Sequence, residues 1–489
     1  MLGTLSDNIG NAVGFAFKIA GKYPNIFFLF FILIGGIGII SHFRESLFIS
    51  KKFSFRRLVK SMRKQNKAPR PMKTDSENCT MIGLNGRRPV YVPDNAKHVF
   101  VCGTTGSGKT VALSNFIQRG IEKDYPLAIV DGKGDIGKGS ILDICQQLCV
   151  QTMKSLYVVN LSNPELSTKY NPFRNANPTM CKDMLINMTE WSEEHYKLNT
   201  ERYLQRLIQL LKMKEIPLSF KTIIGYMPIE AFTGLSTDLL QDKVISKDEH
   251  LLNLEIAKAS GKIAGSAVAR FSTIAEGELG TIFADDGIDI YAAIKEKAII
   301  LFVLNPLMYP EVSPLMGRLA IIDAKQAVNK CFHNSIDRAF YIFDEISSYA
   351  STALLDLINK GRSANITAIL ATQSLSDLDY TDEAFKEQVI ENCNNYIVLR
   401  QNSAKNSEEW AKILGTRATM DVTYQIEQQS RHTNTTGLGS ARPVREFLYH
   451  PDEIKALKVG KGFYLSKDLE MHCRLSVNKP FLSDCEARS

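Results

Sequence analysis

The sequence HVFVCGTTGSGKTVALSNFI, residues 98–117, decides what the rest of the chain can fold into. Its apolar beginning predicts a buried strand at residues 98–102, and its end has the spacing of apolar residues that is typical of a helix. Between them lies the pattern Gly-x-x-x-x-Gly-Lys-Thr, which binds phosphate when a strand precedes it and a helix follows it. We therefore predict a P-loop nucleotide-binding domain of the α/β class.

Each residue type in this loop has a chemical reason to be there. Glycines let backbone N–H groups turn toward phosphate oxygens, and the N-terminus of the following helix adds the positive end of its dipole. Lys109 would neutralise the β- and γ-phosphate oxygens of ATP, and the Thr110 hydroxyl would bind Mg²⁺. The residues expected to bind the nucleotide are Gly103, Thr104, Thr105, Gly106, Ser107, Gly108, Lys109 and Thr110.

A phosphate loop needs an acidic residue that holds the metal ion, and residues 338–350, RAFYIFDEISSYA, supply one. The apolar and aromatic residues at 340–343 predict a strand that ends at Asp344 and Glu345. We expect Asp344 to hold Mg²⁺ and Glu345 to act as the general base on the attacking water. The sequence therefore predicts an ATPase whose cofactor is Mg²⁺.

Apolar runs alternate with helical patterns along the chain, which is typical of a mostly parallel sheet with helices on both faces. The further predicted strands lie at residues 126–135, 156–161, 298–306, 366–373 and 395–401. Residues 176–285 break the pattern, because they are rich in helix formers and show no convincing strand. We predict an inserted all-α domain there, between the two parts of the nucleotide-binding domain at 96–175 and 286–489. The polar stretch at 428–443 is expected to be a loop.

A membrane anchor is predicted near the N-terminus. Residues 26–40, IFFLFFILIGGIGII, are continuously apolar and with their flanks approach the roughly 20 residues that span a bilayer. The ten Lys and Arg residues at 51–73 should keep the following chain in the cytoplasm. We therefore expect an anchor at 1–50 and a basic linker at 51–95. Residues 2–20 form either an amphipathic interfacial helix or a weak first span.

The charge distribution excludes a broad basic surface on the main body. Of the net charge of +7, residues 51–73 contribute +10 and residues 1–50 contribute +1, which leaves −4 for the remaining 416 residues. Contact with nucleic acid there must be local, as in a lined channel. The basic segment itself fits either anionic lipid or nucleic acid. Nine cysteines without a Cys-x-x-Cys pair indicate neither a disulfide framework nor a zinc site.

Taken in order, these motifs resemble the type IV secretion coupling proteins of the TraG/TraD kind. The resemblance extends over residues 20–475 and rests on the membrane segment, GTTGSGKT, IVDGKGD, the helical insertion, YIFDE, INKGRSANITAILATQS and YHPDEIKALKVGKGFYL. It implies a RecA-like, hexameric ATPase in the bacterial cytoplasmic (inner) membrane, crossing it once or twice. Such proteins deliver relaxase-bound single-stranded DNA, and sometimes protein, to a secretion channel during conjugation.

Further polar residues stand at or near the ends of predicted strands. By the resemblance, Gln373 would sense the γ-phosphate, and Arg362 would act in trans on the nucleotide of the next subunit in a ring. Arg400 is a second candidate for that role. Asp131 and Lys133 follow the apolar part of the segment at 126–135 and either approach the nucleotide or substrate at the carboxyl edge of the sheet or form a plain turn.

Departures from the family pattern at the two ends of the chain leave the extracytoplasmic domain and the mode of substrate recruitment open, and two other functions are considered beside the leading one. The N-terminus shows one clear span where the family usually has two, and no long adaptor-binding tail follows at the C-terminus. An FtsK/HerA-like translocase would move double-stranded DNA without a secretion channel, although no sequence-reading terminal module is evident. A docking receptor would use its nucleotide site only to set its assembly state, against which Lys109, Glu345 and Arg362 argue.

Overall fold

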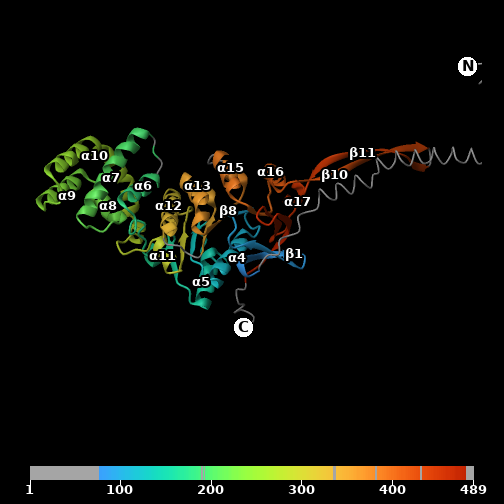
Figure 1. The fold of residues 1–489 in the computed structure, drawn as a ribbon, viewed down its shortest axis with the longest axis horizontal. Helices are drawn as coiled ribbons and strands as arrows, with labels where there is room; N and C mark the ends of the chain where they lie inside the picture. Colours follow the sequence, from blue (N-terminus) through green and yellow to red (C-terminus); the bar gives the residue numbers. More distant parts are fainter. Residues whose placement is uncertain are drawn as a thin grey trace, which may run out of the picture. The chain divides into compact units, whose positions relative to one another are not determined.

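The computed structural model describes residues 76–188, 191, 193–333, 338–379, 383–429 and 432–480 (Figure 1). Within these ranges, residues 76–416 and 447–480 form one compact unit, and residues 417–446 belong to a second. Within the described ranges, no helix is long and apolar enough to cross a membrane. The predicted membrane segment at 26–40 and the basic run at 51–73 lie outside these ranges.

The larger unit is built on an eleven-stranded sheet with the order β2-β1-β13-β12-β9-β3-β8-β7-β4-β6-β5. From β9 to β5 all neighbouring strands are parallel. These strands are β3 (Val99–Cys102), β4 (Leu127–Asp131), β5 (Leu156–Asn160), β6 (Ile299–Val303), β7 (Ala339–Asp344), β8 (Ile366–Thr372) and β9 (Asn395–Leu399). The predicted α/β class is confirmed, with a sheet that is mixed because its other strands join antiparallel.

Helices cover both faces of the parallel region. In β3, Phe100 and Cys102 pack into one apolar cluster, while Val99 and Val101 pack into the other. The helices on the Val99 side are α4 (Lys109–Glu122) and α5 (Ile141–Thr152). Those on the Phe100 side include α12 (Val312–His333), α13 (Thr352–Gly361), α14 (Leu375–Asp379), α15 (Glu383–Asn392), α16 (Ala404–Leu414) and α17 (Pro451–Lys455). Because both faces are buried, these strands are continuously apolar in sequence.

The sequence prediction misses the four antiparallel strands, β1 (Cys79–Asn85), β2 (Arg88–Pro93), β12 (Lys461–Ser466) and β13 (Met471–Val477). The expected linker at 51–95 is therefore wrong in its last part, where β1 and β2 already belong to the sheet. Gly86 turns between them at φ 62°. The connection consists of only two residues, Gly86 and Arg87, but the half-exposed strands beside it show no long apolar run that would indicate a hairpin in the sequence.

Between β5 and β6 the described residues form helices and no named strand. The helices are α6 (Pro178–Asn187), α7 (Glu194–Met213), α8 (Phe220–Tyr226), α9 (Ile229–Gln241) and α10 (Lys247–Ala275), followed by the short α11 (Ile290–Lys295). Figure 1 shows α7 to α10, in green, gathered together away from the sheet. The exact limits of the inserted domain, 176 and 285, stay predictions.

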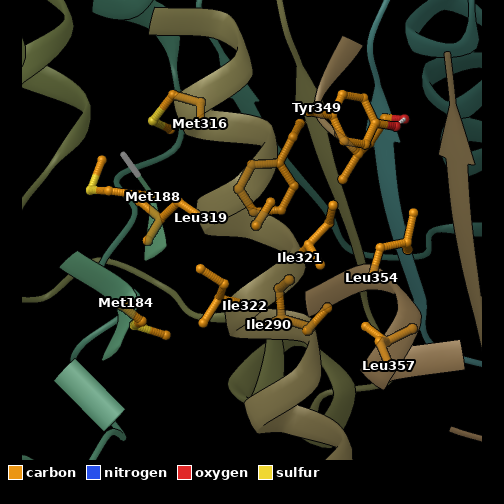
Figure 2. Packing of buried hydrophobic residues seen from close by; sticks show 14 of the residues in the cluster. Met184, Met188, Ile290, Met316, Leu319, Ile321, Ile322, Tyr349, Leu354 and Leu357 are labelled. Atoms are coloured by element: carbon orange, nitrogen blue, oxygen red, sulfur yellow. Dashed lines mark hydrogen bonds between the residues drawn. The ribbon is translucent and has the colours of Figure 1, made fainter. Parts of the chain in front are cut away.

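Helix α12 connects these inserted helices with the layer over the sheet. Figure 2 shows Met184 and Met188 on one side of α12 and Leu354 and Leu357 of α13 on the other. All four side chains are at most 1% exposed. The inserted helices are therefore packed onto the nucleotide-binding core through a continuous apolar contact.

The described part of the smaller unit is a two-stranded ribbon of β10 (Thr416–Gln429) and β11 (His432–Phe447). The loop expected at 428–443 is therefore wrong, since most of it is strand. Asp421 and Arg442 form an ion pair of 3.2 Å between the two strands. Polar composition is a poor guide in such a ribbon because a two-stranded sheet has no core of its own that would require apolar residues.

Asp94 ties the antiparallel end of the sheet to its parallel region. It is 3% exposed. Its carboxylate accepts hydrogen bonds from Thr80 Oγ1 in β1 at 2.8 Å and from Arg119 Nη2 in α4 at 2.7 Å. Its carbonyl oxygen accepts one from Thr367 Oγ1 in β8 at 2.8 Å. One buried carboxylate residue thus links three elements that are far apart in sequence.

We predict that Asp94→Ala lowers the free energy of unfolding by about 3 kcal/mol or more, because it leaves the largely buried Arg119 guanidinium without the carboxylate that balances its charge. Asp124→Ala is the matched control. Asp124 is likewise an aspartate with cationic partners, Lys154 and Lys297, but its side chain is 62% exposed, so we expect its replacement to lower the free energy of unfolding by less than about 1 kcal/mol. Thermal or urea unfolding measures both. Equal losses of stability for the two variants would contradict this account of Asp94.

Candidate ATP site

The phosphate loop joins the end of β3 to the start of α4. Gly106 and Gly108 have φ values of 73° and 106°, in the left-handed region that favours glycine. A Cβ atom on Gly103 would lie 2.5 Å from Ser107 Oγ and 2.7 Å from Leu399 Cβ, so only glycine fits there. The backbone conformation of the loop therefore requires glycine at positions 103, 106 and 108.

Two segments distant in sequence hold the loop in place. The N–H group of Thr104 donates to the carbonyl oxygen of Arg400, which directly follows β9, at 3.0 Å. The N–H group of Gly460, just before β12, donates to the carbonyl oxygen of Ser107 at 2.9 Å. The sequence alone indicates no role for the segment around Gly460. In the structure this segment supports the phosphate loop.

Acidic and amide side chains meet the loop from the two neighbouring strands. Lys109 forms an ion pair with Glu345, and its Nζ lies 3.5 Å from Asp344 Oδ1. Gln373 Nε2 donates to Glu345 Oε1 at 3.1 Å, and Thr105 Oγ1 donates to Gln373 Oε1 at 3.2 Å. These residues come from the carboxyl ends of β3, β7 and β8, which are adjacent in the sheet. The structure thus brings the predicted lysine, acids and glutamine together.

Glu345 has an unusual backbone and an unusual environment. Its φ is 52°, in the left-handed region, and its N–H group donates to Asp344 Oδ1 at 3.0 Å. Such a conformation is strained for a residue with a side chain and occurs preferentially at functional sites. Burial raises the pKa of Glu345, the Lys109 ammonium partly offsets this, and Asp344 adds to it. A carboxylate with a raised pKa is a better general base.

Asp131 lies beside this site at the end of β4, where its Cα pairs with that of Asp344. It is 2% exposed, and burial, followed by the charge of Asp344, raises its pKa to about 7. Its Oδ1 accepts hydrogen bonds from the N–H groups of Lys133 at 3.0 Å and Gly134 at 3.3 Å. The ammonium of Lys133 instead pairs with Asp135 at 3.0 Å. Asp131 therefore holds the turn after β4 through two hydrogen bonds from the backbone. The Lys133 side chain is half exposed and pairs with Asp135.

The two candidate arginines lie at opposite edges of the sheet. Arg400 follows β9 at the edge that carries the phosphate loop, and within the described residues its Nε is buried without a hydrogen-bond partner. Arg362 follows α13 and precedes β8, so it lies at the amino end of the strand whose carboxyl end carries Gln373. A strand of seven residues separates the two ends by about 23 Å. This chain therefore does not bring Arg362 to its own site.

Gln401 was missed by sequence reasoning. It is fully buried behind the loop, and its Nε2 donates to the carbonyl oxygen of Gln373 at 3.4 Å. The same nitrogen lies 3.5 Å from Cys102 Sγ, so Gln401 joins the ends of β3, β8 and β9. The available signal is a polar residue close to the end of a buried strand: Gln401 is the second residue after β9, and Gln373 is the first after β8.

The residues present fit ATP and Mg²⁺. Thr104 Oγ1 and Ser107 Oγ are buried without a hydrogen-bond partner among the described residues, which suits groups that would meet phosphate oxygens. Thr110 and Asp344 offer hard oxygen ligands, and Mg²⁺ typically takes one or two such ligands plus phosphate oxygens and water. The described ranges contain no group of three or more His, Cys, Asp or Glu that could hold a metal ion by itself.

Comparisons with known proteins cover different parts of the chain. Residues 338–459 match the family model described as the TraM recognition site of TraD and TraG. One uncharacterized protein of Mycoplasma pneumoniae is 29% identical over 116 residues, which is 24% of this chain and 75% of that protein. A second from the same organism is 38% identical over 66 residues, which is 13% of this chain and 55% of that protein.

Solved structures show the same fold over most of the chain. The bacterial conjugative coupling protein TrwBdeltaN70 has a TM-score of 0.58 and 16% identity, with 82% of this chain and 88% of that chain covered. VirB4 of Thermoanaerobacter pseudethanolicus has a TM-score of 0.52 and 13% identity, with 82% and 97% covered. TrwB has also been solved with ADP and Mg²⁺. Residues 338–459 therefore resemble one region of the TraD and TraG proteins, and the larger part of the chain has the fold of the conjugative coupling protein TrwBdeltaN70.

Proposed function

We propose that this chain is a membrane-anchored ATPase that delivers DNA, as a relaxase-bound single strand, and in some cases protein, into a type IV secretion channel. The observation that carries the proposal is the cluster of Lys109, Glu345 and Gln373 against the phosphate loop. Its place in a fold shared with a conjugative coupling protein supports the coupling of ATP hydrolysis to substrate delivery.

The side chains of the cluster have distinct roles in this proposal. Mg²⁺, held by Thr110 and Asp344, would supply positive charge to the transferring phosphoryl group. Phosphate oxygens compete with Glu345 for the Lys109 ammonium, because both are anionic. Glu345, once relieved of this ion pair, takes the proton of the attacking water. Gln373 is hydrogen-bonded to both Thr105 and Glu345, so a change in the phosphate loop would change the hydrogen bonding of the general base Glu345.

The proposed ATP site is shared between subunits of a homo-hexamer. The position of Arg362 at the far edge of the sheet supports a role in trans, since it is about 23 Å from its own site. The position of Arg400 beside the phosphate loop supports a role on the nucleotide of its own subunit instead. Of the two arginines, Arg362 is thus the one we assign to the neighbour.

Location and partners are part of the same proposal. The apolar segment at 26–40 would anchor the chain in the bacterial cytoplasmic membrane, with the main body in the cytoplasm. The match of residues 338–459 to a region named for TraM recognition supports contact with a protein partner of the secretion machinery. DNA would be gripped locally inside the ring, as the slightly acidic main body requires.

We predict that Glu345→Gln binds ATP but hydrolyses it about 10²- to 10⁴-fold more slowly, because the amide cannot accept the proton of the attacking water. Nucleotide affinity and steady-state turnover of the purified full chain measure the two effects. Glu122→Gln, at an exposed glutamate of α4, is the matched control and should turn over ATP at the wild-type rate. Normal turnover by Glu345→Gln would rule out its role as the base.

We predict that single-stranded DNA stimulates ATP hydrolysis by the full chain more than double-stranded DNA does, because the proposed substrate is a single strand. Stronger stimulation by double-stranded DNA would favour an FtsK/HerA-like translocase. Absence of stimulation at every protein concentration would contradict a DNA pump. A Lys109→Ala variant that still supports DNA transfer in cells would indicate a docking receptor.

A further inference from the structure

The main chain at Gln373 is held from behind the ATP site by two buried side chains. Gln401 is fully buried, and its Nε2 donates to the carbonyl oxygen of Gln373 at 3.4 Å and to that of Arg400 at 3.2 Å. Cys102 Sγ donates to the same carbonyl oxygen of Gln373 at 3.7 Å. Burial raises the pKa of the Cys102 thiol to about 12, so the thiol keeps the proton that it donates. Gln373 is therefore fixed from the ends of β3 and β9.

The turn after Gln373 is held by the same segment that follows β9. Asn406, in the first turn of α16, is 5% exposed, and its Oδ1 accepts hydrogen bonds from Ser376 Oγ at 2.8 Å and from the N–H group of Ser376 at 3.2 Å. Ser374 and Asp377 close the start of α14 by reciprocal hydrogen bonds, in which the N–H group of each donates to the side chain of the other at 2.9 and 3.2 Å. Gln373 thus lies between two points of attachment, one at its own carbonyl group and one at Ser376.

The segment after β9 also holds the phosphate loop, because the carbonyl oxygen of Arg400 accepts from the N–H group of Thr104 at 3.0 Å. Gln373 itself is exposed, and its side chain reaches across to Thr105 and Glu345. With solvent on one side, its position depends on how its main chain is attached. The segment between β9 and the first turn of α16 therefore sets both the loop and the glutamine that faces it.

The amide of Gln401 carries a cost that packing alone does not explain. Its Oε1 is buried and has no hydrogen-bond partner within the described residues. A buried polar atom without a partner lowers stability, and a methionine, which is unbranched and of similar size, would fill the position without this penalty. The hydrogen bonds that Nε2 makes to the ends of β8 and β9 account for a glutamine at this position.

We propose that Gln401 and Asn406 are positioning residues that hold Gln373 beside Glu345 in the ATP site. This inference rests on the proposed ATPase function and adds two residues to it. Both are buried, and they act through Gln373 and not on the nucleotide. Without them the Gln373 side chain is free to leave the general base, while Gly460 and the backbone at 400 still hold the phosphate loop. Turnover should therefore fall while the affinity for nucleotide is kept.

A double-mutant cycle on the full chain tests the role of Gln401. Gln401→Met should lower kcat for ATP about tenfold and leave KM within about twofold, because it loosens Gln373 but not the phosphate loop. Its Tm should not fall, since the substitution removes a buried oxygen without a partner. Gln373→Ala should lower kcat at least as much, and adding Gln401→Met to it should have no further effect, because residues that act through one another are not additive.

Gln326→Met is the matched control for Gln401→Met. Gln326 of α12 is also buried and also donates to a backbone carbonyl oxygen at 3.4 Å, that of Met180 in α6, which is not part of the ATP site. This variant should keep the wild-type kcat. A wild-type kcat in Gln401→Met, or a double variant that is slower than Gln373→Ala by the full factor of Gln401→Met, would overturn the role of Gln401.

Asn406 allows a test with two substitutions of similar size. Asn406→Asp keeps the oxygen that accepts from Ser376 and places a carboxylate in the first turn of α16, where the helix dipole favours it, so kcat should stay at the wild-type value. Asn406→Leu removes this oxygen and should lower kcat about tenfold with KM unchanged. Titration with a fluorescent ATP analogue measures nucleotide affinity in both variants. Equal kcat values, or loss of nucleotide binding in Asn406→Leu, would overturn the positioning role of Asn406.

The same measurements separate this inference from the proposed function. Wild-type turnover in Gln401→Met and Asn406→Leu, together with slow turnover in Glu345→Gln, would overturn the positioning role and leave the ATPase proposal standing. Normal hydrolysis by Glu345→Gln would instead overturn the role of Glu345 as the base, whatever the other two variants do.

Discussion

The ion pair between Lys109 and Glu345 is the interaction on which the account of this protein depends. The two residues are 236 positions apart in the chain and meet only because β3, β8 and β7 are adjacent and parallel. Parallel strands all end at the same edge, so the residues that follow them are gathered without any further folding device. Helices on both faces, the Asp94 cluster and the segment at Gly460 keep these strand ends in register.

The same topology gives the sheet two chemically different edges. The carboxyl edge carries the phosphate loop, Asp344, Glu345 and Gln373. The amino edge carries the end of α13 with Lys360 and Arg362. A single chain keeps these groups apart by the length of a strand.

The sequence predicts the strands of the parallel region and most of the site residues at their ends, because these strands are buried on both faces. Strands covered on both faces must be apolar throughout, so all seven parallel strands are visible as apolar runs. Asp344, Glu345 and Gln373 are recognisable because they stand at the end of such a run, and Lys109 is recognisable because it belongs to the Gly-x-x-x-x-Gly-Lys-Thr pattern. The antiparallel strands carry a weaker pattern, and the β10–β11 ribbon has none of the burial that would reveal it.

Other parts of the site could not be predicted because they arise from contacts between distant segments. Nothing near Gly460 or Gln401 shows that these residues support the phosphate loop. The raised pKa of Asp131 follows from its burial beside Asp344, which only the strand order creates. The distinction between Arg362 and Arg400 also needs the strand order, because in sequence both simply lie near the end of an element.

The most direct test of the central claim is an experimental structure of the full chain with Mg²⁺ and a non-hydrolysable ATP analogue. The account predicts that Lys109 Nζ contacts the β- and γ-phosphate oxygens and no longer pairs with Glu345, and that the Gln373 side chain lies beside the γ-phosphate. A nucleotide bound away from residues 103–110, or a Lys109 that keeps its ion pair with Glu345 in the bound state, would contradict it.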